Sequence, residues 1–560
     1  MAKVRMPVVV SVFLAAACVD NVSGPPAAVC LSNYSPLALT VGQYVAIDPV
    51  PTQGCVIFPA NASAIDSGEY LLVPQTISEV PDFSAPFKIA GTGPLTAQVM
   101  ASRFAANIAP NAPSEAAAFH TLLREMERAR TYPGLAGAQA PFMASAPAAP
   151  ARVVLNDVRS FMVLKDIIKG GYTTVTATAL SVGTHAAIFV DNAAPANGLT
   201  TTDLDSLRDA FDQKLYPADT AAFGRESDID GNGQVIILMT GVVNHLVTAS
   251  QCTSGGYVAG FFFGADIDPQ TAYVVNNGEV FYTMLADPTG SLSCAHSVAQ
   301  VKRVVPGTLI HEFQHMISYN HHVLEQAPAA RKAEVLWLNE GLSHYAEELG
   351  GRAYLPDTIT FCNYVSGDLE NAAGYLSAPG SHPLVDTSGI GGLEERGAGW
   401  LFVRYIVDRF SADTSVGAQN LVTRKLVTTA LTGTNNVTQQ TGQAYAITAG
   451  EWALANWASD LPGFAAPQAL KYKLWTFRTA YPKLNAKCGA SIAPTFPLVA
   501  TANPGPAVNV SGNMIAGSGA TYQRALQGKS GPSFNVLFSD ATGAQLKATV
   551  SPRLNVLRIR

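Results

Sequence analysis

Two histidines and a glutamate at residues 311–315 offer the clearest chemistry in the chain. The stretch LIHEFQHMI places His311 and His315 four positions apart, with Glu312 directly after the first histidine. At about 3.6 residues per turn, both imidazoles project from one helix face and can bind the same zinc ion. Glu312 is rotated by about 100° from His311, so it is better placed to hold a water beside the metal than to bind the metal. The alternative is a helix that carries two histidines and no metal.

The stretch WLNEGLSHYAEEL at 337–349 predicts a second helix that can complete such a site. A catalytic zinc needs a third protein ligand and an open position for water. If the second helix packs antiparallel to the first, the carboxylate of Glu340 faces the two imidazoles. The alternative is that Glu340 is one acid among several, since Glu334, Glu347 and Glu348 are close by.

The pairing of HEFQHMI with WLNEGLSHYAEEL resembles the glutamate-zincin metallopeptidases (gluzincins), which include thermolysin and aminopeptidase N. It resembles more closely the hyicolysin-type bacterial neutral zinc metallopeptidases. The resemblance implies that His311, His315 and Glu340 bind one Zn²⁺ and that Glu312 is the catalytic acid–base. It implies an exported endopeptidase that acts on a protein or peptide substrate. The alternatives are an aminopeptidase-type zinc hydrolase, and a surface binding or adhesion lipoprotein on an inactive zincin scaffold.

Three further stretches fit the hyicolysin-type pattern, and with them the resemblance covers roughly residues 110–480. They are SDIDGNGQVIIL at 227–238, GAGWLFVRYIVDRF at 397–410 and TGTNNVTQQTG at 432–442.

Two features depart from the thermolysin pattern. The gap before Glu340 is longer, and His344 stands four residues after Glu340, where thermolysin has an aspartate that supports a zinc-bound histidine. Ser343 or Glu347 is therefore predicted to orient a zinc ligand. A hydrogen-bond donor to the oxyanion is also expected, although packing is the commoner role for such residues. The candidates are Tyr319, His344, Tyr345 and His382.

Composition sets the outer limits. The chain has 560 residues, which predicts two to four domains. Its formal net charge of −6 argues against a nucleic-acid partner, and no internal run is apolar and long enough to span a bilayer.

The first residues read as an export signal. A short basic start, an apolar run and small residues follow one another over residues 1–17. The sequence AAAC before residue 19 resembles a lipoprotein cleavage box, which would leave a lipid anchor on Cys18. We therefore predict a lipoprotein of the bacterial cell envelope, with simple secretion as the alternative.

The cysteines fit an oxidising compartment. Seven are present, and six remain once Cys18 is set aside as the lipid anchor. Six cysteines allow 15 pairings. Sequence order suggests Cys30–Cys55, Cys252–Cys294 and Cys362–Cys488.

The pattern of elements predicts an α+β fold flanked by small β modules. The resemblance implies a zincin-type core, a mixed sheet plus a mainly helical lower half. The predicted parts are a signal peptide (1–17), an N-terminal β module (18–105), a helix with an Ala/Pro-rich linker (106–151), the zincin metallopeptidase domain (152–482) and a C-terminal β-rich module (483–560). Residues 19–150 are compatible with a pro-segment and equally with an accessory module.

Three other signals have a structural and a functional interpretation. DIDGNG contains Asp228, Asp230 and Asn232 in calcium-loop spacing, but Met239 stands where that loop has its glutamate, so a turn is favoured over a Ca²⁺ site. Residues 273–285 predict a hairpin whose strand before the zinc helix is a candidate edge for substrate. The pair His321–His322 is expected to be a helix-end cation pair.

Overall fold

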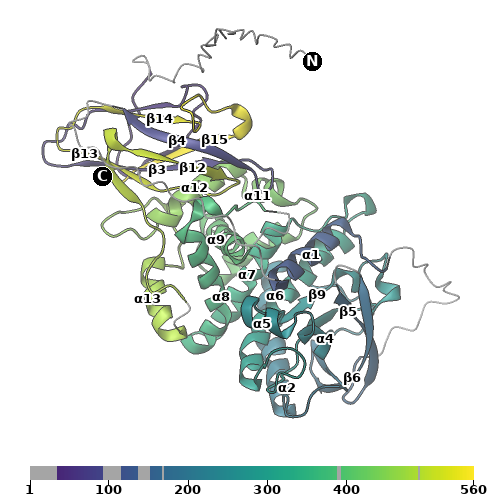
Figure 1. Ribbon diagram of the computed structural model, residues 1–560. Coiled ribbons are helices and arrows are strands. Elements are labelled where there is room, and N and C mark those ends of the chain that lie inside the picture. Colours follow the sequence, from purple (N-terminus) through teal and green to yellow (C-terminus); the bar gives the residue numbers. More distant parts are fainter. Residues whose placement is uncertain (1–33, 93–114, 136–151, 167–169, 387–391, 490–491) are drawn as a thin grey trace, which may run out of the picture.

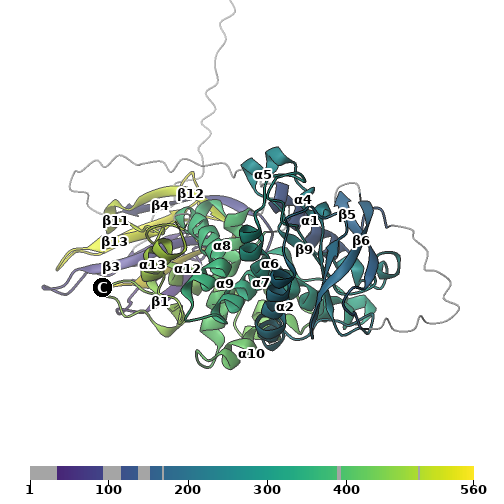
Figure 2. The ribbon, with the colours of Figure 1, turned by 90° about the horizontal axis from the view of Figure 1, so that it is seen from below.

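The computed structural model describes six stretches of the chain, and the fold is α+β, as predicted. The described residues are 34–92, 115–135, 152–166, 170–386, 392–489 and 492–560. A mixed sheet lies at one end of the molecule and a β sandwich at the other, with a group of helices between them (Figures 1 and 2). The predicted boundaries at 17, 105 and 151, the export signal and Cys18 lie outside the described residues.

The mixed sheet has six strands in the order β5-β6-β7-β8-β10-β9. Strands β7, β8 and β10 are parallel, whereas β9 pairs antiparallel with β10 at the edge. The strands are β5 (Val158–Asp166), β6 (Gly171–Val182), β7 (Ala186–Asp191), β8 (Val235–Met239), β9 (Gly260–Phe262) and β10 (Val280–Thr283).

Helices cover this sheet and fill the space between it and the sandwich (Figure 2). The helices are α1 (Glu115–Ala129), α2 (Thr201–Ala210), α3 (Tyr216–Phe223), α4 (Gly241–Asn244), α5 (Ala249–Gly255), α6 (Val298–Tyr319), α7 (Leu336–Arg352), α8 (Thr358–Ser377), α9 (Leu393–Phe410), α10 (Val416–Val427), α11 (Gly433–Thr441), α12 (Tyr445–Ala458) and α13 (Phe477–Cys488). No helix in these described stretches is long and apolar enough to cross a membrane.

The sandwich combines the two ends of the described chain. One sheet has the order β1-β15-β3-β13-β11 and the other β12-β4-β14-β2, so strands from before α1 alternate with strands from after α13. The strands are β1 (Tyr44–Ile47), β2 (Cys55–Phe58), β3 (Gly68–Thr76), β4 (Ser84–Thr92), β11 (Thr501–Pro504), β12 (Asn509–Ile515), β13 (Gln523–Gln527), β14 (Phe534–Ser539) and β15 (Pro552–Arg558).

This arrangement corrects the prediction of two separate β modules. Neither segment has enough strands to enclose a core by itself, and the rings of Phe58 and Phe534, one from each segment, stack with centroids 4.6 Å apart. The predicted boundary at residue 482 is also misplaced, since it falls inside α13.

The predicted hairpin at 273–285 is wrong. Residues Ala272–Val274 form a short 3₁₀ helix, and only the second half of the segment is a strand, β10. Strand β10 lies between β8 and β9, so the edge of the sheet is β9 and not the strand just before the zinc helix.

Two of the suggested disulfides are present, Cys252–Cys294 and Cys362–Cys488. Cys30 lies outside the described residues, so its pairing with Cys55 stays a prediction.

Close packing of α7 on α9 explains the glycine of the NEG motif. A Cβ on Gly341 would lie 2.7 Å from the carbonyl oxygen of Gly399, which is too close for any side chain. Beside this contact the buried Arg404 of α9 binds Glu348 of α7 and Asp408 of its own helix. The NEG helix is therefore held at a fixed depth and rotation, which decides where its acidic side chains point.

Candidate metal centre

Helices α6 and α7 supply the three predicted metal ligands. Ser297 caps the start of α6 by accepting a hydrogen bond from the backbone N–H of Gln300. The second half of α6 is buried on all sides, so the histidines of the HEFQH motif point into the interior toward α7. The side chains of His311, His315 and Glu340 are at most 6% exposed.

The ligand atoms form a triangle of the size expected for zinc. The two Nε2 atoms of His311 and His315 lie 3.2 Å apart. The carboxylate oxygens of Glu340 lie 3.6 Å from the Nε2 atom of His311 and 3.5 Å from that of His315. Ligand bonds of about 2.0–2.2 Å in tetrahedral geometry place ligand atoms about 3.3–3.6 Å apart. The three side chains can therefore bind one ion with little movement.

The charges around this triangle favour an ionised carboxylate. Burial acts to raise the pKa of Glu340, but Arg396 and the two histidines outweigh it, so that the pKa lies well below its usual range. Burial, reinforced by Arg124, lowers the pKa of His315 to about 3. His315 is thus held as neutral imidazole, the form that binds metal.

His311 differs because two carboxylates face it. Burial acts to lower its pKa, but the nearby carboxylates of Glu340 and Glu347 raise the pKa to about 9. A metal ion at this position competes with that proton, so metal binding releases it.

Both histidines are oriented through their second ring nitrogen. The Nδ1 atom of His311 lies 2.8 Å from the carboxylate of Glu347. The Nδ1 atom of His315 lies 3.1 Å from Oδ1 of Asn339 and 3.0 Å from Oγ of Ser343. The structure thus places Glu347 and Ser343, the two predicted supporting residues, against the candidate ligands His311 and His315, respectively. Sequence reasoning missed Asn339, although it is the first letter of the NEG motif.

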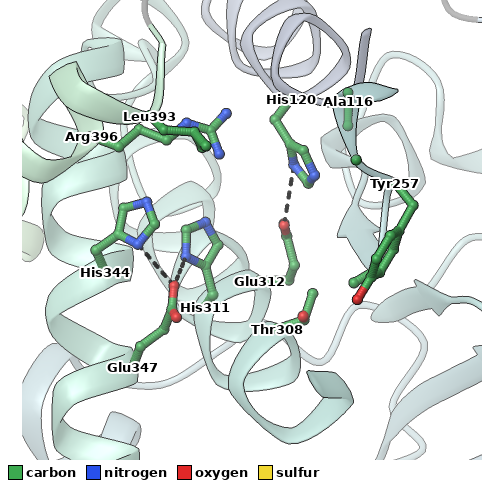
Figure 3. A pocket seen from close by; sticks show the side chains of 13 residues that line it. Ala116, His120, Tyr257, Thr308, His311, Glu312, His344, Glu347, Leu393 and Arg396 are labelled. Atoms are coloured by element: carbon green, nitrogen blue, oxygen red, sulfur yellow. Dashed lines mark hydrogen bonds and ion pairs between the residues drawn. The ribbon is translucent and has the colours of Figure 1, made fainter. Parts of the chain in front are cut away.

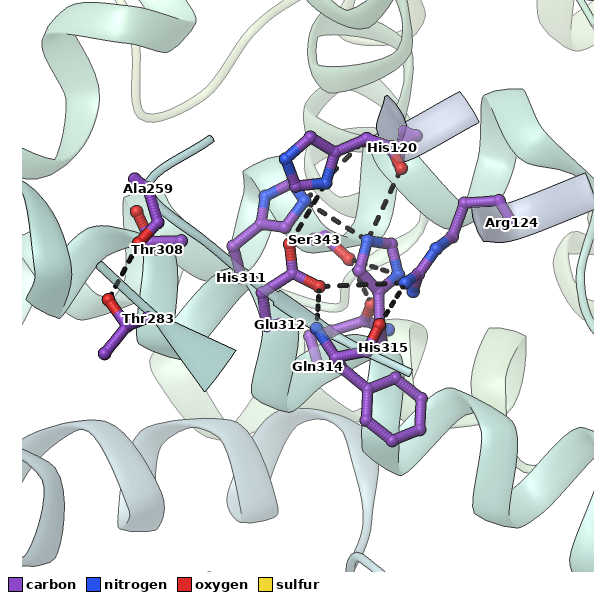
Figure 4. Close-up of polar contacts among 12 residues, drawn as sticks. His120, Arg124, Ala259, Thr283, Thr308, His311, Glu312, Gln314, His315 and Ser343 are labelled. Atoms are coloured by element: carbon purple, nitrogen blue, oxygen red, sulfur yellow. Dashed lines mark hydrogen bonds and ion pairs between the residues drawn. The ribbon is translucent and has the colours of Figure 1, made fainter. Parts of the chain in front are cut away.

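Glu312 lies beside the triangle and is fixed by groups from other elements (Figure 4). Its Oε2 accepts a hydrogen bond of 3.0 Å from the backbone N–H of Phe262 in β9. Its Oε1 lies 3.4 Å from Nδ1 of His120. Burial raises the pKa of Glu312, while Arg124 and His311 act in the opposite direction.

Helix α1 forms the opposite wall of the site, which the sequence did not indicate. His120 and Arg124, one turn apart on α1, both face Glu312. Arg124 is buried and donates a hydrogen bond to the carbonyl oxygen of Phe262, while Glu127 accepts one from the N–H of Gly264. Nothing in the local sequence EAAAFHTLLREMERA distinguishes these residues from an ordinary amphipathic helix, because their partners lie far along the chain.

A cavity of about 250 Å³ opens between these two walls. In Figure 3, His311, His344 and Glu347 lie on one side, and Glu312 lies nearer to His120 and Tyr257. The residues that line it are Ala116, His120, Gly255, Gly256, Tyr257, Ala259, Thr308, His311, Glu312, His344, Glu347, Leu393 and Arg396.

His344 is the predicted oxyanion donor that lines this cavity. Its Nε2 atom lies 4.0 Å from Glu340, and its Nδ1 atom lies 2.9 Å from both Glu347 and Asp368. Burial acts to lower the pKa of His344, but these two carboxylates raise the pKa to about 10, so the ring is cationic. Asp368 of α8 was not singled out in the sequence.

The other three donor candidates lie elsewhere, which corrects the prediction. Tyr345 points away from Glu340, and its hydroxyl contacts Arg404 and Gln419. The remaining two candidates are engaged by acids: the Tyr319 hydroxyl donates to Asp268, and His382 pairs with Glu395.

The expected cation pair at the end of the zinc helix is also wrong. His322 is fully buried, and burial lowers its pKa to about 4, so it is neutral. His321 pairs with Glu325 one turn later.

Comparison with known proteins shows a similarity over part of the chain. No protein-family profile matches the chain. The chain is similar to the neutral metalloprotease ShpI of Staphylococcus hyicus, with 28% identity over 213 residues. The aligned part is 37% of this chain and 44% of that protein, so the chain spans less than half the length of this relative. The likeness supports a metallopeptidase relationship and implies a metal ion, for which candidate ligand groups are present.

Proposed function

We propose that the chain is a zinc-dependent endopeptidase of the hyicolysin type, with a zincin core. The observation that carries the proposal is the triangle of His311, His315 and Glu340, whose ligand atoms lie 3.2–3.6 Å apart. Two imidazoles and a carboxylate are a donor set of catalytic zinc sites, which leave a position open for water.

The residues present fit a zinc ion. Both carboxylate oxygens of Glu340 are buried and accept no hydrogen bond, and the Nε atom of Arg396 lies 3.8 Å from Oε2. Burying an ionised carboxylate is costly, and a metal ion bound between it and the two histidines would offset that cost further. His311 and His315 each use Nδ1 for a supporting contact, so Nε2 is the nitrogen left for the metal.

Glu312 is placed to move the proton. When bound, zinc supplies a Lewis acid that lowers the pKa of a coordinated water toward about 7. The carboxylate of Glu312 takes the proton of the attacking water and delivers it to the leaving nitrogen. Burial raises the pKa of Glu312 above that of an exposed glutamate, which makes its carboxylate a stronger base. The Phe262 N–H holds one oxygen, leaving Oε1 on the side of His120.

His344 and Arg396 supply positive charge at the same cavity. The carboxylates of Glu347 and Asp368 both lie against Nδ1 of His344. The protonated Nε2 can therefore donate a hydrogen bond to a developing oxyanion. We therefore retain His344 as the oxyanion donor.

Two features favour internal cleavage over removal of amino-terminal residues. The carboxylates among the described residues that line the cavity are Glu312 and Glu347, and both have assigned contacts. Neither is spare to bind a substrate's free amine. The edge strand β9 also runs past the cavity, and Ala259 just before it lines the wall. Glu312 and Arg124 already bind the backbone N–H and carbonyl of Phe262. A peptide substrate is therefore expected to pair with the strand beside Gly260.

The test compares the chain from residue 19 with its Glu312→Gln variant, measuring zinc content and casein hydrolysis. We expect about one zinc in each protein and at least a 10³-fold loss of turnover in the variant, on the order of removing a key catalytic group. Internal fragments support an endopeptidase, whereas single residues released from the amino terminus would support an aminopeptidase. Zinc binding without turnover in either protein would favour the binding-protein alternative.

A further inference from the structure

The stretch DIDGNG, which the sequence favours as a plain turn, lies against a buried glutamate from elsewhere in the chain. Carboxylate oxygens of Asp228, Asp230 and Glu279 all lie within 4.8 Å of one another. Oxygens bound to one Ca²⁺ at about 2.3–2.6 Å lie no more than about 5 Å apart. We propose that these three carboxylates form a calcium site, separate from the zinc centre and independent of the proposed catalytic activity.

Glu279 provides the observation that a turn alone does not explain. It is 2% exposed, and its Oε2 atom is buried without a hydrogen-bond partner. Its other oxygen is fully used, because Oε1 accepts hydrogen bonds from Ser227 Oγ at 2.5 Å and from the N–H of Ile229 at 3.1 Å. These contacts hold the carboxylate against the loop and leave its second oxygen buried and unpaired.

The loop shares the glycine turn of a calcium loop. Gly233, the sixth residue counted from Asp228, has φ +68°, which suits the sharp turn that such loops make at this position. Its N–H binds Oδ1 of Asp228 at 3.1 Å. Asn232 donates its side-chain amide to Asp230 at 2.7 Å, which orients that carboxylate.

The sheet explains how Glu279 reaches this loop. Met239, which occupies the usual position of the bidentate glutamate, is buried in β8 and cannot turn back. Strand β10 runs parallel to β8, with Val280 opposite Ile236. The residue before β10 is therefore placed beside the start of β8, where the loop ends, and the N–H of Ile236 binds the Glu279 carbonyl at 2.8 Å.

The charges agree with a cation at this place. Burial raises the pKa of Glu279 to about 7 and also raises that of Asp230, since three acids crowd together in a partly dry cavity. Two arginines line the same cavity of about 310 Å³. Arg225 donates to the Tyr216 hydroxyl and Arg152 donates to the carbonyls of residues 183 and 184, so both arginines are engaged by groups other than the three acids.

The test is calcium titration of the full chain by calorimetry, after chelation and restoration of zinc. We expect one calcium site with a Kd on the order of 10⁻⁴–10⁻³ M, as in extracellular calcium modules. At a hundredfold excess over Kd, Tm should rise by about 3 °C. No uptake at about 10 mM calcium, tenfold above that range, would overturn the proposal, and magnesium binding as tight as calcium would overturn the choice of ion.

Three variants assign the site to its residues. Glu279→Gln keeps the shape of the side chain and should weaken calcium binding at least about tenfold, because one of three charges is lost. Asp228 is exposed, so Asp228→Asn should disturb the fold little and tests the site even if the first variant is unstable. Glu334→Gln is the matched control, since Glu334 is equally buried but lies outside the cluster, and it should bind calcium normally. Unchanged calcium affinity in Glu279→Gln or Asp228→Asn contradicts the assignment, while zinc content reports on the catalytic centre separately.

Discussion

The proposed zinc centre and the acidic cluster at the start of β8 have the same arrangement of local and distant residues but offer different ligand atoms. In each, a short local motif supplies most of the ligands and a glutamate from a distant element completes the set: Glu340 for the histidines, and Glu279 for the loop acids. The proposed zinc centre lies on a pair of packed helices and offers two imidazoles and one carboxylate, whereas the acidic cluster includes a loop and offers carboxylate oxygens. A motif that lacks one ligand in the local sequence can therefore be completed by a residue that the fold brings to it.

The largest expected effect separates the two centres. Glu340→Gln should weaken zinc binding on the order of 10³-fold, because one of the three protein groups expected to bind the metal loses its negative charge. The same variant should show no hydrolysis at trace zinc concentrations. Calcium affinity should not change. Competition titrations with a zinc chelator measure the first, and calorimetry measures the second. A variant with normal zinc affinity would show that Glu340 is not a ligand.

A second prediction concerns a buried acid that needs no cation. Glu334 accepts hydrogen bonds at both oxygens, from the N–H groups of Val335 and Gly433 and from Asn436. Burial nevertheless raises its pKa from 4.5 to about 7. The folded state therefore holds this proton more tightly than the unfolded chain does. The contribution of Glu334 to the free energy of unfolding is fully present below pH 4.5 and is lost as the pH rises through about 7. It amounts to on the order of 3 kcal/mol.

Glu334→Gln should remove this contribution, so its free energy of unfolding should fall less between pH 5 and pH 8 than that of the wild type. Urea unfolding at the two pH values, without calcium, measures the difference. Equal pH slopes in the two proteins would show that Glu334 titrates alike in the folded and unfolded chains.

The smallest effect concerns how the zinc ligands are oriented. Glu347→Gln should weaken zinc binding about 10–100-fold, as expected when the carboxylate that supports a ligand histidine is lost. Ser343→Ala should have a smaller effect, because Asn339 still contacts the same nitrogen of His315. The two variants are compared by the same chelator titration. Equal losses would mean that the two histidines depend equally on these partners.

Much of the candidate metal centre could be predicted from the sequence because the pattern of its residues is local. The four-residue spacing in HEFQH fixes two side chains on one helix face. The NEG motif in the second helix indicated Glu340 as the third predicted ligand. Glu347 and Ser343 were found by the same helical spacing. Tyr345 failed as an oxyanion donor, since its position on α7 faces Arg404 of α9, and no local pattern shows which helix lies on that side.

The α1 wall and the calcium cluster could not be predicted because their partners are brought together only by folding. His120 meets Glu312 across the cavity, and Glu279 meets Asp228 through the parallel pairing of β10 with β8. The sandwich is a similar case, because the strands at the two ends of the chain each read as a separate small module. Helical periodicity and motif spacing therefore determined which side chains of α6 and α7 share a face and were predicted as zinc ligands and base, whereas the tertiary structure decided every contact whose two sides are far apart in sequence.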